Sequence, residues 1–143
     1  MESPEERAVR YFNSGYNCAE AVLKAVADEV GTGIEDPQRF ATAFGGGIAK
    51  QGHTCGCLSG AAMAIGLLAG RTAPDDAAGK ERVYAAVTRL FEKFKMRAGA
   101  VDCRDITGLT FDQATHHTVC CPLVGFAARA AYEEILGMRA STG

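Results

Sequence analysis

Hydrophobic residues recur along the chain at the spacing of one face of an α-helix. The clearest stripe follows positions i, i+4, i+7, i+8 and i+11 and consists of Val83, Val87, Leu90, Phe91 and Phe94. Charged residues in this segment lie largely off the stripe, as they do in an amphipathic helix. Similar stripes begin at Cys18 and Leu123, and no segment alternates apolar and polar residues for long enough to predict a strand. The pattern therefore predicts an all-α fold.

Turn signals divide these stripes into separate elements. We expect helices at 4–13, 17–30, 37–44, 54–70, 76–97 and 121–137, with a short helical turn near 102–107. Glycine-containing breaks separate them. The helix at 54–70 carries Gly or Ala on most of its faces, which favours close packing by several neighbours. Because there is no internal repeat or linker, residues 1–143 are predicted to form a single-domain helical bundle of about six helices around this small-residue-rich central helix.

The composition is that of one compact globular domain. Of the 143 residues, 48% are hydrophobic and 22% are charged, and the net charge is −2 with acids and bases interspersed. That balance argues against nucleic acid or an anionic membrane surface as a partner. The first seven residues lack the apolar core of a secretory signal. The longest apolar run, 58–69, is shorter than the roughly 20 residues of a membrane span. We expect a cytoplasmic protein without membrane insertion.

Six cysteines are the main chemical feature of the chain. In a reducing cytosol they favour metal ligation or redox chemistry over structural disulfides. Four of them fall at predicted helix starts: Cys18, Cys55, Cys103 and Cys121. The first three each follow a residue type that caps helices, namely Asn17, Thr54 and Asp102. Cys121 precedes Pro122, which is favoured at the first helical position, so Cys121 itself is the expected N-cap.

A thiol at a helix start is in an environment that stabilises its anion. The unpaired N–H groups and the positive end of the helix dipole lower the pKa of the thiol. The thiolate is then available at neutral pH as a nucleophile or a metal ligand. Four converging helix starts would supply the donors for an iron–sulfur cluster or a tetrahedral zinc ion. The alternative is that each cysteine is a small buried apolar residue.

The other two cysteines fit this pattern less well. Cys57 lies two residues after Cys55, about 200° around a helix, so the two share a site only where the first helical turn is unwound. A buried small residue is therefore the favoured interpretation of Cys57. Cys120 is adjacent to Cys121, where it is a candidate for a resolving or exchange thiol.

Three histidines and a glycine-rich segment lie near these cysteines in the sequence. His53 precedes Cys55, and His116 and His117 precede Cys120. Each histidine suits metal ligation or deprotonation of a thiol, although exposed loop histidines without a role are common. The glycines at 45–47 are expected to form a simple loop, the alternative being that they bring backbone N–H groups close to an anionic centre.

The cysteine pattern resembles that of the C_GCAxxG_C_C family of small redox-active proteins. The resemblance covers nearly the whole chain and rests on SGYNCAEAV at 14–22, FGGG at 44–47, CGCLSGA at 55–61, CRDITG at 103–108 and CPLV at 121–124. It implies a helical domain whose signature cysteines are Cys18, Cys55, Cys103 and Cys121. It also implies a redox role with a bound iron–sulfur cluster, since a related domain accompanies the split-Soret type of cytochrome. The chain departs from the pattern at Cys57, where Ala is more usual, and it adds Cys120.

Three hypotheses of function follow from these residues. The leading one is an iron–sulfur protein in which Cys18, Cys55, Cys103 and Cys121 hold the cluster for electron transfer with an unidentified redox partner protein. The alternative is a metal-free thiol–disulfide oxidoreductase or sulfur carrier, in which Cys18 or Cys55 attacks and a second cysteine resolves. The third is a non-enzymatic helical module with a structural zinc ion. A homodimer is compatible with the sequence.

Overall fold

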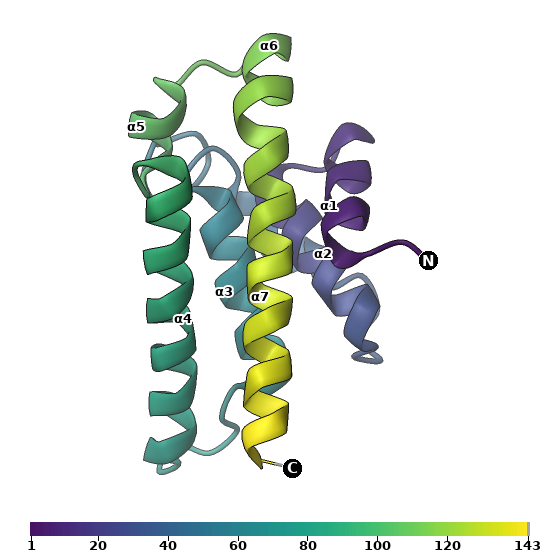
Figure 1. Cartoon of the computed structure of the whole chain (residues 1–143), viewed down its shortest axis with the longest axis vertical. Helices are drawn as coiled ribbons and strands as arrows, with labels where there is room; N and C mark the ends of the chain where they lie inside the picture. The colour runs from purple at the N-terminus through teal and green to yellow at the C-terminus, as the bar shows by residue number, and fades with distance from the viewer. Residues whose placement is uncertain (143) are drawn as a thin grey trace.

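The computed structural model describes residues 1–142, and its regular structure is helical (Figure 1). In chain order the elements are α1 (Pro4–Asn13), α2 (Cys18–Val30), the 3-10 helix η1 (Pro37–Phe44), α3 (Gly56–Ala69), α4 (Ala77–Ala98), α5 (Cys103–Thr107), α6 (Gln113–Thr115), the π-helical turn η2 (His116–Cys120) and α7 (Cys121–Thr142). Residues 1–142 contain no strand, only an isolated bridge between Thr54 and Asp102. The predicted all-α single-domain fold is confirmed.

Helix α2 begins at a residue that local capping interactions determine. The Asn17 side chain accepts a hydrogen bond from the Glu20 N–H at 2.9 Å, and the Glu20 carboxylate accepts one from the Asn17 N–H at 2.9 Å. This reciprocal capping box fixes Cys18 as the first residue of α2. Glu20 also accepts a hydrogen bond from the Thr42 hydroxyl at 2.9 Å, which ties the start of α2 to η1.

The small residues of α3 permit close packing, as the sequence predicts. Helix α3 packs against α2, α4 and α7, and an added Cβ at Gly60 would overlap the backbone carbonyl of Ala19 in α2. Larger side chains from the surrounding helices complete the core. Those that are fully buried include Leu23, Leu58, Ile65, Leu90, Phe94, Val124 and Ile135.

The last helix, α7, begins at Cys121 as predicted, but it continues directly from the π-helical turn η2 and has no free N-terminus there. Helices α6 and α7 run on through η2 as one continuous rod (Figure 1). Pro122 cannot donate a backbone hydrogen bond, and its ring crowds the carbonyl four residues earlier. The π-helical turn accommodates it, since the Cys121 N–H reaches back five residues to the His116 carbonyl. Cys121 therefore lies inside a continuous helical segment. The prediction that it is an N-cap is wrong.

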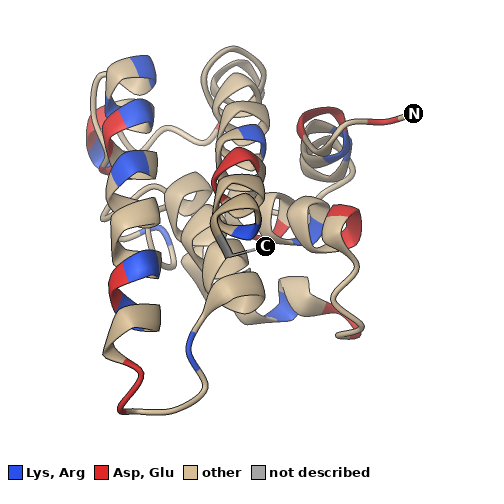
Figure 2. Ribbon diagram, turned by 60° about the horizontal axis from the view of Figure 1, so that its bottom comes forward, with Lys and Arg blue, Asp and Glu red and all other residues tan. Residues whose placement is uncertain are grey.

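Charged side chains lie on the outer faces of the helices, and Figure 2 shows acids and bases next to one another along α4. One buried group links α4 to the core. Glu134 of α7 is 7% exposed and pairs with Arg89 at 2.9 Å and with Lys93 at 3.1 Å. Among the described helices, none has the length and apolar character needed to cross a membrane.

The contact at Gly60 gives a test of the packing. We expect Gly60→Ala to lower the free energy of unfolding by about 1–3 kcal/mol, because the new methyl group forces α2 and α3 apart. Gly66→Ala is the matched control in the same helix, since an added Cβ there meets no atom within 4 Å. The control should raise the free energy of unfolding by roughly 0.5–1 kcal/mol through helix propensity. Urea denaturation followed by circular dichroism measures both, and similar effects of the two substitutions would contradict the close α2–α3 contact.

Candidate functional site

The starts of α2 and α3 meet at a glycine. A Cβ added to Gly56 would overlap Cys18 Sγ, so only glycine lets the first turn of α3 approach that sulfur so closely. Gly56 lies between Cys55 and Cys57, and the close approach therefore brings these three cysteines together. All six cysteines of the chain are free thiols.

Main-chain pairing adds Cys103 to this group. The Cys55 N–H donates to the Val101 carbonyl at 2.8 Å, and the Cys103 N–H donates to the His53 carbonyl at 2.7 Å. These bonds hold the segment before α3 beside the segment before α5, with the Thr54–Asp102 bridge between them. Cys103 is 4% exposed, and its Sγ lies 3.5 Å from the Thr107 hydroxyl. Two cysteines nearly fifty positions apart in sequence are thus fixed in one place.

Cys18 is the cysteine of this group whose thiol has a lowered pKa. The Cys57 thiol, and then the backbone N–H groups of Gly46, Ala19 and Cys18, stabilise its anion. Together these donors outweigh burial, which acts in the opposite direction, and lower the pKa of Cys18 to about 7. A substantial fraction of Cys18 is therefore thiolate at neutral pH. Cys18 as a whole residue is half-buried.

Cys57 is the donor in this arrangement. It is 1% exposed, and its pKa lies well above the ordinary value because its proton is shared with Cys18, then with Cys55, and because burial disfavours its anion. The sequence-based objection that Cys55 and Cys57 point 200° apart does not apply. Cys55 is the N-cap of α3, with extended backbone angles of φ −53° and ψ 134°, and so lies outside the helical repeat.

The adjacent pair Cys120 and Cys121 divides between two environments. Burial and then the charges on Cys18, Cys55, Cys103 and Cys121 raise the pKa of Cys120 to about 12, so Cys120 lies within electrostatic range of the other cysteines. Cys121 instead donates from its Sγ to Asn13 Oδ1 of α1 at 3.3 Å, and burial raises its pKa. We call Cys18, Cys55, Cys57, Cys103 and Cys120 the cysteine cluster.

The cysteine cluster therefore differs from the predicted convergent set. Three of the four predicted members are present: Cys18, Cys55 and Cys103. Cys121 is turned away, and the residues expected to be secondary, Cys57 and Cys120, take part. Within residues 1–142, no group of three or more His, Cys, Asp or Glu side chains is arranged so that it could hold a metal ion.

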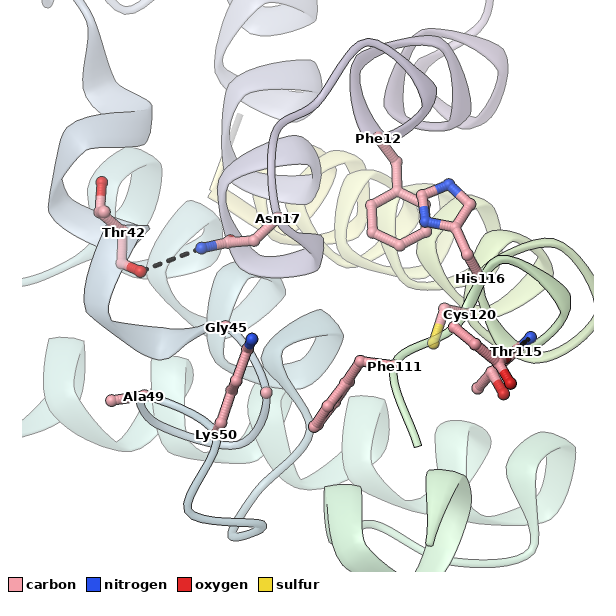
Figure 3. A pocket seen from close by; sticks show the side chains of 12 residues that line it. Phe12, Asn17, Thr42, Gly45, Ala49, Lys50, Phe111, Thr115, His116 and Cys120 are labelled. Carbon is pink, nitrogen blue, oxygen red and sulfur yellow. Dashed lines mark hydrogen bonds between the residues drawn. The ribbon is translucent and has the colours of Figure 1, made fainter. Parts of the chain in front are cut away.

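A pocket of about 440 Å³ lies beside the cysteine cluster (Figure 3). Cys120 lines it, and so do Asn17 and Gly46. Asn17 precedes Cys18 in the sequence, and the backbone N–H of Gly46 stabilises the Cys18 anion. On one wall the ring of His116 stacks on Phe12, with 3.9 Å between centroids and 1° between planes. The opposite wall is formed by Phe111 and Lys50. The surface of the pocket is thus largely apolar, with three aromatic rings and a few polar groups, as is usual for small-molecule sites.

The loop that carries Gly46 and Lys50 is strained. Five consecutive residues are left-handed, with φ of 67° at Gly46, 71° at Gly47, 68° at Ile48, 45° at Ala49 and 63° at Lys50. For residues other than glycine this conformation costs about 1–2 kcal/mol each. Hydrogen bonds from the Ala49 N–H to the Ala43 carbonyl (2.8 Å) and from the Lys50 N–H to the Gly45 carbonyl (3.1 Å) hold it. The sequence allows two interpretations of the glycines at 45–47: a simple loop, or backbone N–H groups placed beside an anion. The structure supports the second, because the Gly46 N–H stabilises the Cys18 anion.

The three histidines contribute in different ways. His53 is exposed and takes part through its backbone, as the acceptor for Cys103. His117 is exposed and its ring pairs with the Gln113 side chain at 3.1 Å. His116 forms part of the pocket wall, pairs with Asn13 Oδ1 at 3.0 Å, and has its pKa lowered by burial and then by His117. The described structure brings none of them to Cys18 as a base.

Sequence reasoning missed the pocket residues Lys50 and Phe111, because both lie in loops. The one signal for Phe111 is an aromatic residue in a short connection between helices, and in the structure it is 45% exposed. For Cys57 and Cys120, the signal is their closeness in sequence to signature cysteines, two residues after Cys55 and one before Cys121.

Comparison with known proteins identifies one family. The model of the family described as "Putative redox-active protein (C_GCAxxG_C_C)" matches residues 16–134. A search of the curated proteins and a search of the solved structures return no match.

The environment of Cys18 predicts how its reactivity depends on pH. Its alkylation by iodoacetamide should rise with pH through a midpoint near 7, because the thiolate is the reactive form. Cys57→Ala removes the strongest donor to this sulfur, so the midpoint should move up toward the ordinary value of 9.0 and the rate at pH 7 should fall by about fivefold or more. Cys57→Ser keeps a donor and is the matched control. Mass spectrometry of the Cys18 peptide measures the rates, and an unchanged midpoint in Cys57→Ala would disprove the assigned cause.

Proposed function

Because the chain belongs to the C_GCAxxG_C_C family of redox-active proteins, we propose that it performs thiol–disulfide exchange with Cys18 as the attacking thiol and Cys57 as the resolving thiol. The observation that carries this proposal is the close approach of α3 to Cys18: a Cβ at Gly56, the residue before Cys57, would overlap Cys18 Sγ. Each of the two thiols is accordingly the largest influence on the pKa of the other. Two neighbouring thiols need only a small movement to form a disulfide.

The reaction balances without any further reagent. The Cys18 thiolate attacks one sulfur of a substrate disulfide, forms a mixed disulfide with that half and releases the other half as a thiolate. Cys57 then loses its proton and attacks Cys18 Sγ, which forms the Cys18–Cys57 disulfide and releases the second half. The two protein thiols are oxidised, the substrate disulfide is reduced to two thiols, and the protons of the two cysteines end on the products.

The different environments of the two thiols suit these two roles. An attacking thiol is most effective when its pKa is close to the ambient pH, as that of Cys18 is. A resolving thiol should not compete for the substrate, and Cys57 is both buried and protonated. Once Cys18 is in a mixed disulfide, it no longer carries the charge that Cys57 was stabilising. The buried thiol of Cys57 is then released to act.

Trapping the intermediate tests the assignment of the two roles. Wild-type protein treated with the neutral hydroxyethyl disulfide should gain one internal Cys18–Cys57 disulfide and retain no adduct. Cys57→Ala should instead accumulate a stable mixed disulfide on Cys18, because its resolving thiol is missing. Cys121→Ala is the matched control and should behave as wild type. Peptide mapping by mass spectrometry reads out each state, and a Cys18–Cys55 disulfide in the wild type would overturn the choice of Cys57.

An iron–sulfur cluster for electron transfer is a second proposal, supported by the family resemblance and by the sulfur chemistry of the site. Cys18, Cys55, Cys103 and Cys120 come from separate elements and influence one another electrostatically. Thiolates of this kind are the usual ligands of iron–sulfur clusters and of structural zinc. Within residues 1–142 the side chains as arranged do not enclose a metal ion, so binding a cluster would require them to move closer together.

Anaerobic purification tests this second proposal. A bound cluster predicts visible absorbance together with iron and acid-labile sulfide in the protein, whereas zinc predicts a colourless protein with stoichiometric zinc. If the cysteine cluster is the site, Cys120→Ser should reduce the iron content at least about twofold and Cys121→Ser should leave it unchanged, because Cys121 faces Asn13. A colourless, metal-free protein that does not take up iron and sulfide on reconstitution would contradict both metal proposals.

A further inference from the structure

The pocket beside the cysteine cluster has features that the exchange reaction alone does not require. It is bordered by two aromatic walls and contains an ammonium group that no acid neutralises. Lys50 Nζ lies 5.5 Å from the centroid of the Phe111 ring. Among residues 1–142, no carboxylate forms a salt bridge with it. An ammonium held above an aromatic ring at the rim of a pocket is positioned to meet an anionic ligand.

From this arrangement we propose that the pocket recognises small disulfides that combine an aromatic or other flat apolar body with an anionic group. The apolar body would lie between the Phe12–His116 wall and Phe111, and the anionic group would contact Lys50. This inference rests on the proposed exchange function, because the pocket would hold the half of the substrate that Cys18 does not retain. That half leaves as a thiolate, so its own sulfur also becomes negative as the bond to it breaks.

The position of the pocket relative to Cys18 supports this role. Gly46 lines the pocket and donates its N–H to Cys18 Sγ, so the attacking sulfur and the pocket share one residue as a boundary. Asn17, the residue before Cys18, lines it as well. Cys120, another member of the cysteine cluster, also lines it.

The strained loop 46–50 connects the two parts of this proposal. The same five left-handed residues carry, at one end, the N–H that donates to Cys18 and, at the other, the ammonium that faces the pocket. Ile48, Ala49 and Lys50 would be free of this strain in a right-handed turn. Such a turn would move the side chain of Lys50 relative to Gly46. Strain of this kind is characteristic of segments that fix the geometry of a binding site.

The remaining charged and titratable groups of the lining leave Lys50 as the dominant positive charge. Asp112 accepts a hydrogen bond from the Thr115 N–H at 2.8 Å, which makes its carboxylate the N-cap of α6. His116 has a lowered pKa and is neutral at pH 7. Phe111 is 45% exposed although it is a large apolar residue, and a bound apolar ligand would cover it.

Paired disulfide probes separate this inference from the proposed function. Dithiobis(nitrobenzoate) carries a carboxylate on each aromatic ring, whereas dithiodipyridine is aromatic and neutral at pH 7, and each releases a coloured thiol when a thiolate attacks it. The initial rate of reaction at Cys18, assigned by mass spectrometry, is measured with both probes. The ratio of the anionic to the neutral rate reports recognition of charge. The rate with the neutral probe reports the nucleophilicity of Cys18 and the binding of an aromatic body, without the contribution of an anionic group.

We expect Lys50→Glu to lower this ratio by about tenfold at low salt, and the difference should shrink at high salt. Lys50→Gly removes the charge and relieves the left-handed strain, so it should fold at least as well as wild type while lowering the ratio by about threefold. The rate with the neutral probe should change by less than about twofold in both variants. Lys80→Glu is the control of equal net charge, at the start of α4 and at the opposite end of the molecule from α6 (Figure 1).

Each outcome decides the matter. An unchanged ratio in both Lys50 variants, or an equal fall in Lys80→Glu, would overturn recognition of the anionic group and leave the exchange function standing. Failure of Cys18 to react with either probe in the wild type would overturn the exchange function, and the inference with it. A lower ratio in both Lys50 variants, with the neutral rate preserved, supports the inference.

Discussion

The missing side chain at Gly56 is the constraint on which the rest of the site depends. Any Cβ there would overlap Cys18 Sγ, and the same helix meets α2 again at Gly60, against the Ala19 carbonyl. Two glycines one turn apart thus let α3 lie against the first turn of α2 at backbone distance. Each weakens the helix by about 1 kcal/mol relative to Ala, and close packing offsets that loss. The contact between Cys18 and Cys57 is a direct consequence of this approach.

Loop 46–50 is the second element that fixes the chemistry, and it does so in a different way from the helices. The helices position sulfur atoms by packing, whereas the loop positions one N–H and one ammonium by holding an unfavourable backbone conformation. Lack of space explains the glycine before this loop, Gly45, and one within it, Gly47. A Cβ at Gly45 would lie 2.7 Å from Asn17 Nδ2, and one at Gly47 would lie 2.7 Å from the His53 N. The loop is therefore confined by the capping residue of α2 on one side and by the segment before α3 on the other.

The sequence predicts those parts of the structure that depend on local interactions. Helix periodicity and capping residues are local, so the main helices and the positions of Cys18, Cys55 and Cys103 at helix starts follow from short windows. Cys121 was misplaced because a proline at the first helical position and a proline after a π-helical turn have the same local sequence. Only the long-range packing of residues 113–120 against α1 decides between them. Here that packing includes the stacking of His116 on Phe12.

The grouping of the cysteines could not be predicted in detail for a related reason. The pairing of the segments before α3 and α5 is a long-range main-chain contact, and neither segment has a periodic pattern that would reveal it. The predicted angle of about 200° around the helix between Cys55 and Cys57 is wrong for the same reason. It assumes that the helix includes Cys55, whereas α3 begins after Cys55. The role of a residue such as Lys50 depends on the side chains that face it across the pocket. Those side chains are distant in sequence, so a short sequence window cannot reveal the role.

Electrostatics within the cysteine cluster limits how many of its sulfurs are charged at once. The negative charge on Cys18 and Cys55 raises the pKa of Cys103 and of Cys120, after burial has already raised both. The first thiolate to form thus keeps its neighbours protonated, and one thiolate among several thiols is the state expected at neutral pH. That state suits exchange, which needs one nucleophile and one proton-bearing partner at a time. Binding of a metal would require the opposite, the loss of several protons together, and its affinity would consequently fall steeply as the pH is lowered.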